Sequence, residues 1–135
     1  MVSKRGAKQK GSNAERDVIK LFWNTGEWVA HRMAGSGSSQ YPSPDIIAGN
    51  GVRFLAIEVK ITSENARYFP KKEIEELKFF SQKFGSEAWI AIKFFRKEWS
   101  FLNIEDLRET DNSFVAESED AERKGLSFEQ LTKGF

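Results

Sequence analysis

PDIIAGNGVRFLAIEVK, residues 44–60, is the stretch of sequence that decides the fold. Its second half alternates as a β-strand does, with Ile57 and Val59 on one face and Glu58 and Lys60 on the other. The rest of the run is mostly apolar. The pattern predicts a central strand of a sheet, with two charged side chains near its end that need an explanation.

The two charged residues have two interpretations. Glu58 and Lys60 can neutralise each other at the end of the sheet, with Asp45 as an ordinary turn residue. Alternatively, a hairpin through residues 48–51 brings Asp45 beside the end of the strand, so that two carboxylates and an ammonium meet. Carboxylates suit Mg²⁺, which also binds water and substrate phosphate, and a nearby lysine can orient water or offset phosphate charge. This second interpretation predicts a phosphodiester-cleaving site.

The composition excludes several other kinds of site. The chain has 135 residues, which suits one domain, and it has no cysteine and a single histidine, His31. Disulfides, thiolate metal sites and a histidine zinc site are therefore excluded, which leaves oxygen ligands for any metal. No apolar run is long enough for a membrane span, and no hydrophobic segment follows the basic N-terminus. We therefore expect a cytoplasmic protein without a membrane partner.

Charge is distributed unevenly along the chain. Residues 1–104 hold seventeen Lys and Arg against eleven Asp and Glu, whereas residues 105–135 hold four against nine. A basic body with an acidic tail is compatible with a polyanionic partner that approaches one side of the molecule.

The N-terminal residues are basic and show no apolar periodicity. We therefore predict a flexible basic arm over residues 1–11 and a single domain over residues 12–135. Such an arm is either a solvated tail or a segment that follows a phosphate backbone without sequence preference. The cations that would make these DNA contacts are Lys4, Arg5, Lys8 and Lys10.

A helix is predicted to begin at Ser12 or Asn13 and to run to about residue 23. Glu15 has two interpretations within it. It can complete a capping box with Ser12, by bonding back to the N–H of the cap residue. Alternatively, it is a third carboxylate that leans over the metal site. The next residue, Arg16, lies where the helix dipole disfavours a cation, which indicates an anionic partner nearby.

The rest of the chain alternates between predicted strands, loops and helices. The predicted elements are a strand over 28–33, a Gly- and Ser-rich loop ending at Asp45, a loop over 62–69, a helix from Pro70 to Phe84, a hairpin of strands 87–95 and 99–104, loop or edge structure over 105–120, and a last short helix capped by Ser127. The inward side of the long helix is expected to carry Ile74, Leu77, Phe80 and Phe84.

Five local patterns follow one another in a distinctive order. They are Asn13-Ala14-Glu15-Arg16, a strand ending in Arg32, Ala34-Gly35-Ser36, Pro44-Asp45-Ile46-Ile47-Ala48 and Ile57-Glu58-Val59-Lys60. This order resembles that of the archaeal Holliday junction resolvases, which belong to the PD-(D/E)xK nuclease superfamily. The resemblance covers residues 12–104, whereas the remainder of the chain matches only loosely.

The resemblance implies a fold and an activity. The fold is an α/β restriction-endonuclease-like core, with a mixed central β-sheet flanked by helices. The activity is metal-dependent resolution of four-way DNA junctions by paired symmetric nicks, carried out by a homodimer without a nucleotide cofactor. Two alternatives stay open. One is a restriction or repair endonuclease of the same superfamily, and the other is a junction-binding protein that keeps the fold without cutting.

The resemblance also implies roles for individual residues. Asp45 and Glu58 would hold Mg²⁺, with Mn²⁺ as a possible substitute. Glu15 and the backbone carbonyl of Val59 would complete the metal site, and Lys60 would assist the attacking water. The positions that match family residues near the DNA are Arg16, Arg32 and Ser36.

Overall fold

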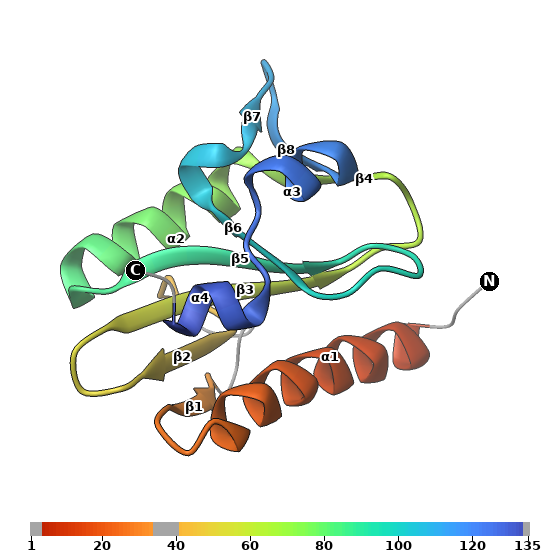
Figure 1. Ribbon diagram of the computed structural model, residues 1–135. Helices are drawn as coiled ribbons and strands as arrows, with labels where there is room; N and C mark the ends of the chain where they lie inside the picture. Colours follow the sequence, from red (N-terminus) through yellow and green to blue (C-terminus); the bar gives the residue numbers. More distant parts are fainter. Residues whose placement is uncertain (1–3, 34–40, 134–135) are drawn as a thin grey trace.

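The computed structural model describes residues 4–33 and 41–133, which form two β-sheets with helices around them (Figure 1). The elements in chain order are α1 Lys4–Asn24, β1 Val29–Arg32, β2 Ile46–Gly49, β3 Phe54–Ile61, β4 Ala66–Pro70, α2 Lys71–Phe84, β5 Glu87–Lys93, β6 Ser100–Asn103, the short 3-10 helix η1 Ile104–Asp106, β7 Arg108–Glu109, β8 Ser113–Glu117, α3 Ser118–Lys124 and α4 Phe128–Lys133. None of the described helices combines the length and the apolar character that crossing a membrane requires.

The larger sheet has the strand order β1-β2-β3-β5-β6, so β3 lies at its centre. β3 and β5 run parallel, whereas the other neighbouring pairs in this sheet are antiparallel. A parallel pair needs a crossover, because the chain must return to the same end of the sheet before the second strand begins. β4 and α2 supply this crossover. The mixed central sheet flanked by helices confirms the predicted fold class.

The predicted alternation of β3 is confirmed, because its two faces belong to two separate hydrophobic clusters. Leu55 and Ile57 pack in one cluster, together with Phe22 of α1. Ala56 packs in the other cluster, which includes residues of α2. Figure 1 shows α1 and α4 on one side of the larger sheet and α2 on the other. Burying a large apolar side chain stabilises the fold by about 1.5–3 kcal/mol, so this alternation fixes which face of the sheet carries Glu58.

A second, three-stranded sheet has the order β4-β8-β7. The predicted loop over residues 62–69 is wrong from Ala66 onward, because β4 begins there. The prediction of loop or edge structure over residues 105–120 omits β8, which is the middle strand of this sheet. These strands pair with residues far along the chain, as Tyr68 does with Val115. Sequence patterns identify strands mainly by their alternation and by short turns, and neither marks a pairing at this distance.

α1 begins at Lys4, so the predicted helix start at Ser12 or Asn13 is wrong. The first turns consist mainly of Lys, Ala and Gln, which favour helix strongly enough to offset two glycines. Glu15 therefore lies in the interior of α1, where it cannot close the predicted capping box. Residues 1–3 of the predicted arm lie outside the described residues.

The predicted ends of α2 and the start of α4 are confirmed. α2 begins directly after Pro70 and ends at Gly85, whose φ of 83° is the left-handed conformation that favours glycine at a helix end. At α4, the Ser127 Oγ accepts a hydrogen bond from the Gln130 N–H at 3.1 Å, and the Gln130 Oε1 accepts one from the Ser127 N–H at 2.9 Å. This reciprocal pair is a capping box.

The buried face of α2 differs from the prediction at one position. Ile74 and Leu77 are buried as predicted, and Phe80 is partly buried. Phe84 is 56% exposed and stacks on Phe80, with 5.1 Å between the ring centroids, so its predicted burial is wrong. Ser81 is buried instead, because it continues the helical stripe that starts at Ile74 and passes through Leu77.

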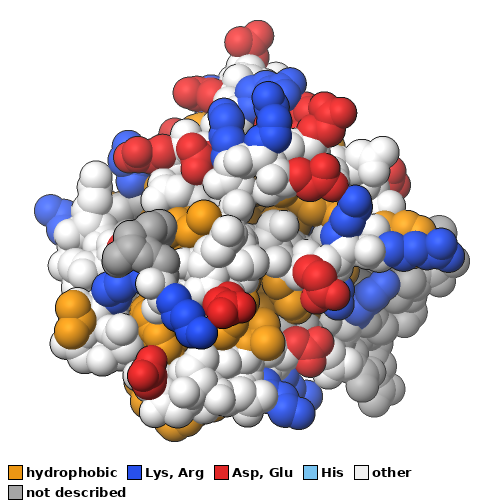
Figure 2. Space-filling view, viewed as in Figure 1, with side chains coloured by type: hydrophobic (Ala, Val, Ile, Leu, Met, Phe, Trp, Pro, Cys, Tyr) orange, Lys and Arg blue, Asp and Glu red, His pale blue; other side chains and the backbone are white. Residues whose placement is uncertain are grey.

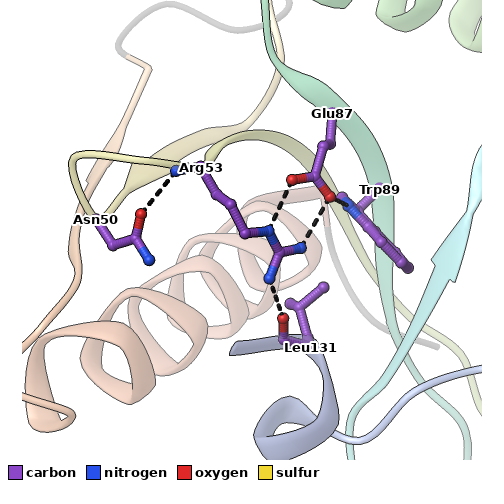
Figure 3. Close-up of polar contacts among 5 residues, drawn as sticks. All are labelled: Asn50, Arg53, Glu87, Trp89 and Leu131. Atoms are coloured by element: carbon purple, nitrogen blue, oxygen red, sulfur yellow. Dashed lines mark hydrogen bonds and ion pairs between the residues drawn. The ribbon is translucent and has the colours of Figure 1, made fainter. Parts of the chain in front are cut away.

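Arg53 lies immediately before β3 and joins three elements (Figure 3). Its guanidinium donates to both carboxylate oxygens of Glu87, at 2.8 Å each, and to the Leu131 carbonyl in α4. The Trp89 Nε1 donates to the same carboxylate at 3.0 Å, and the Asn50 Oδ1 accepts a hydrogen bond from the Arg53 backbone N–H at 2.7 Å. The start of β3 is thereby tied to both β5 and α4.

Candidate active site

Asp45 lies at the end of the larger sheet, where the chain enters β2. The antiparallel register of β2 and β3 pairs Ile46 with Ile57, so the next positions outward, Asp45 and Glu58, lie side by side. The Asp45 Oδ2 accepts a hydrogen bond from the Val59 N–H at 2.9 Å. The hairpin thus brings Asp45 beside the end of the strand, as the sequence predicts, and the backbone of β3 orients its carboxylate.

Glu58 is a buried acid at the same place, with 7% of its surface exposed. The pKa of its carboxyl is raised from 4.5 to about 9, first by burial and then by the charges of Asp45 and Glu73, whereas the Lys60 ammonium lowers it. Two neighbouring carboxyls in a buried place cannot both ionise readily without a compensating cation. A divalent cation is one group that would supply this compensation.

Lys60 forms an ion pair with Glu73 of α2, with 3.0 Å between the Lys60 Nζ and the Glu73 Oε1. Sequence reasoning missed Glu73. The signal that could have identified it is its position one helical turn before Leu77, on the side of α2 that faces the sheet. A hollow of about 330 Å³ is lined by Ser43, Asp45, Glu58, Lys60, Glu73, Glu76 and Leu77.

Glu15 of α1 lines a second hollow, of about 420 Å³, which is also lined by Asp45 and Lys60. Its Oε1 accepts a hydrogen bond from the Arg32 Nε of β1 at 3.1 Å. Burial raises the pKa of Glu15, the charge of Asp45 adds to this rise, and the hydrogen bond from Arg32 opposes it. Because Asp45 and Lys60 line both hollows, the site extends from α2 to α1.

The oxygen donors fit a magnesium site centred on Asp45 and Glu58. Carboxylate oxygens are the hard ligands that Mg²⁺ prefers, with water and substrate phosphate filling the other positions. The Val59 carbonyl faces the same edge of β3 as its N–H, since a strand residue presents both groups to one neighbour. In residues 4–33 and 41–133, no three His, Cys, Asp or Glu side chains are grouped as a complete metal centre. Glu15, the third predicted acid, pairs with Arg32 instead.

Three of the predicted DNA-contacting residues have described side chains. Lys10 is exposed and lines the second hollow. Arg16 is exposed on α1, and Arg32 is held by Glu15. Lys4, Arg5 and Lys8 lie in the first turns of α1, with side chains that the structure does not describe, and Ser36 lies outside the described residues.

Comparison with known proteins gives one consistent result. A family model for the archaeal Holliday junction resolvase (hjc) matches residues 6–135. Crossover junction endodeoxyribonuclease Hjc of Archaeoglobus fulgidus is 45% identical over 107 residues, which cover 79% of this chain and 78% of that relative. The protein of the same name from Sulfolobus acidocaldarius is 30% identical over 128 residues, which cover 93% of this chain and 88% of the relative.

A solved structure gives the same result at the level of the fold. It is that of Archaeoglobus fulgidus Hjc, described as a Holliday junction resolvase from an archaeal hyperthermophile. The two structures align with a TM-score of 0.83 and 37% sequence identity, over 90% of this chain and 98% of the other. The fold is therefore the restriction-endonuclease-like core that the resemblance implies, and this chain belongs to the archaeal Holliday junction resolvase family.

Proposed function

We propose that this chain is a divalent-cation-dependent endonuclease that resolves four-way DNA junctions by paired nicks in two strands. The observation that carries the proposal is the placement of Asp45 beside Glu58 at the end of β3, in one hollow with Lys60. Membership of the family supports it, because the relatives are named crossover junction endodeoxyribonucleases.

The two carboxyls would have different tasks because their surroundings differ. The Val59 N–H orients the Asp45 carboxylate, so this ligand is in position before a cation binds. Glu58 holds a proton near neutral pH because its pKa is raised, and it would give up that proton when a cation compensates its charge. When bound, Mg²⁺, or Mn²⁺ as a substitute, supplies charge neutralisation at the phosphate and at the leaving oxygen.

The Lys60 ammonium is the group that would act on the attacking water or on charge that develops at the phosphate. Glu73 holds its Nζ at 3.0 Å, which keeps the flexible side chain at the hollow. Glu15 and its partner Arg32 would form the opposite wall of the site, with Lys10 and Arg16 contacting phosphates from α1. Water is the nucleophile, so no covalent intermediate with the chain is needed.

A homodimer is part of the proposal. An apolar hollow of about 440 Å³ has Val29, Phe54 and Phe84 on its lining, and these side chains are 50%, 48% and 56% exposed. Apolar side chains gathered at a surface mark interaction sites. A two-fold dimer would present two equal active sites, which suits symmetric nicks in a branched DNA that is itself nearly two-fold symmetric.

The test compares two DNA substrates of identical sequence in Mg²⁺, a four-way junction and a linear duplex. We expect nicks in two opposing strands of the junction and slow or no cutting of the duplex. Equal rates on the two substrates would favour a restriction or repair nuclease and contradict the proposal. Binding of the junction without any cutting would contradict it as well, because the chain would then be a junction-binding protein.

A further inference from the structure

Arg67 of β4 faces the site but has no role in the scheme above. Strand alternation places Arg67 on the same side of β4 as Phe69, which is fully buried. The Arg67 side chain therefore faces the protein and is partly buried. There it lines the second hollow. The residues that line this hollow include Lys10, Glu15, Asp45, Lys60 and Arg67.

Arg67 differs from Arg32 and Lys60, two other cations of the site, because its side chain lacks an acidic partner. Arg32 pairs with Glu15 at 3.1 Å, and Lys60 pairs with Glu73 at 3.0 Å. The side chain of Arg67 forms no ion pair or hydrogen bond with the residues that the structure describes, and its Nε is enclosed without an acceptor. An enclosed N–H without an acceptor destabilises a protein, so the arrangement calls for a ligand that accepts hydrogen bonds.

We propose that Arg67 binds a backbone phosphate of the DNA strand that enters the active site, an inference that rests on the proposed function. A guanidinium presents a planar fork of N–H donors that matches two phosphate oxygens. Glu15 and Asp45 line the same hollow but form no ion pair with Arg67, so its guanidinium is available to the DNA. Because the Nε–H is enclosed in this structure, the end of the side chain would turn toward the hollow when the phosphate binds.

The position of the hollow indicates which phosphate Arg67 would bind. The second hollow adjoins the first through Asp45 and Lys60, so it would take the phosphate next to the one that is cut. Lys10 lines the same hollow from α1, so the strand would pass between two cations. Figure 2 shows Lys and Arg side chains interspersed with Asp and Glu on the right of the view, toward the N-terminal end of α1.

The test measures binding of a four-way junction in EDTA, over a range of salt concentrations, for the wild type and Arg67→Met. Methionine keeps an unbranched stem and removes the charge. We expect affinity to fall about tenfold, and the slope of log affinity against log salt to decrease by about 0.9 for each phosphate that the variant no longer binds. Arg67→Lys should keep the slope but bind the junction more weakly than the wild type, because an ammonium cannot donate as a fork.

Thermal unfolding without DNA separates this role from a structural one. Arg67→Met should leave the unfolding midpoint unchanged or raise it, because the variant removes an unpaired enclosed N–H. Arg123→Met is the matched control, since Arg123 lines neither hollow and pairs with Asp120 at 2.7 Å. It should keep the wild-type salt slope.

Two outcomes would overturn the proposal. One is an unchanged salt slope in Arg67→Met, and the other is loss of folded protein in that variant, which would make Arg67 structural. Cleavage of the four-way junction by the wild type in Mg²⁺ is measured in a separate experiment, which distinguishes failure of this proposal from failure of the proposed function. A wild type that cuts junctions while Arg67→Met binds normally contradicts this proposal alone. A wild type that binds through Arg67 but never cuts contradicts the proposed function alone.

Discussion

The two ends of β3 hold their charged side chains in opposite ways. At its start, Arg53 donates two hydrogen bonds of 2.8 Å to Glu87, and these bonds lower the pKa of the Glu87 carboxyl. At its end, Glu58 is buried beside Asp45, and its pKa is raised to about 9. The start of β3 therefore lies beside a matched pair of charges, and its end carries part of a mismatched cluster.

This difference separates charges that stabilise the fold from charges that await a ligand. The matched pair is complete within the chain, so removing one partner should weaken folding and leave the chemistry alone. The mismatched cluster destabilises the protein until a cation or substrate binds, which is common at functional sites. Variants at the two ends of β3 should therefore have opposite effects on stability and activity.

The largest effect is expected at the mismatched end, from Asp45→Asn. Cleavage of the four-way junction in Mg²⁺ should fall by about 10³-fold, because a neutral amide cannot offset the charge of a cation. Junction binding in EDTA should be retained. Asp111→Asn, at an exposed position in the turn between β7 and β8, is the matched control. Cutting at the wild-type rate by Asp45→Asn would show that the site is elsewhere.

Glu58→Gln should change the pH dependence of stability in metal-free protein. Since the folded pKa lies above 4.5, the folded state keeps a proton that the unfolded state has lost. The free energy of unfolding of the wild type should therefore fall as pH rises from about 4.5 to about 9, by up to about 1.4 kcal/mol per pH unit.

Glutamine cannot titrate, so Glu58→Gln should remove most of this slope. The variant should be more stable than the wild type in mildly alkaline buffer and should not cut DNA. Denaturant titrations in EDTA at several pH values measure the effect. A wild type whose stability rises with pH across this window would contradict the buried, protonated state of Glu58.

At the matched end, Arg53→Met should lower the free energy of unfolding by about 2 kcal/mol, because Glu87 and the Leu131 carbonyl lose their donor. Cleavage per folded molecule should stay near the wild-type value. Adding Glu87→Leu should recover part of the stability, because no unpaired carboxylate then remains. A loss of activity without a loss of stability would remove the contrast between the two ends.

The smallest effect is expected from Glu73→Gln. The charge of Glu73 raises the pKa of Glu58, so its removal should move the acid limb of the pH–rate profile toward lower pH. The change in rate on that limb should be about threefold. Glu75→Gln, exposed on the same helix, is the control. A shift toward higher pH, or the same shift in the control, would mean that Glu73 does not act on Glu58.

The sequence predicts the parts of the molecule that depend on short-range patterns. The alternation of β3 and the turn after β2 predict both the central strand and the meeting of Asp45 with Glu58. The bounds of α2 are predicted by Pro70 and Gly85. Proline suits the start of a helix, and glycine permits the left-handed conformation at its end. The fold class and the part of the site formed by Asp45, Glu58 and Lys60 follow from these few signals.

The parts that could not be predicted depend on contacts between distant segments. β4 pairs with β8 across more than forty residues of chain, so no short turn between these two strands marks their pairing. Glu73 and Arg67 join the site from the crossover. Helical spacing places Glu73 on the inward side of α2, but only the packing of α2 and β4 against the sheet brings these two side chains to the site. The start of α1 differs from its prediction because the helix formers around its two glycines outweigh them.

The contact between α1 and α4 has a consequence for the order in which the protein matures. Phe22 meets Phe128 edge to face, with 4.9 Å between the ring centroids, and Leu131 is fully buried in the same cluster. The ribosome synthesises α1 long before α4, so during translation α1 lacks the packing contacts that α4 provides. Since α1 carries Glu15, a nascent chain that has not yet formed α4 lacks part of the packing that supports this side of the site.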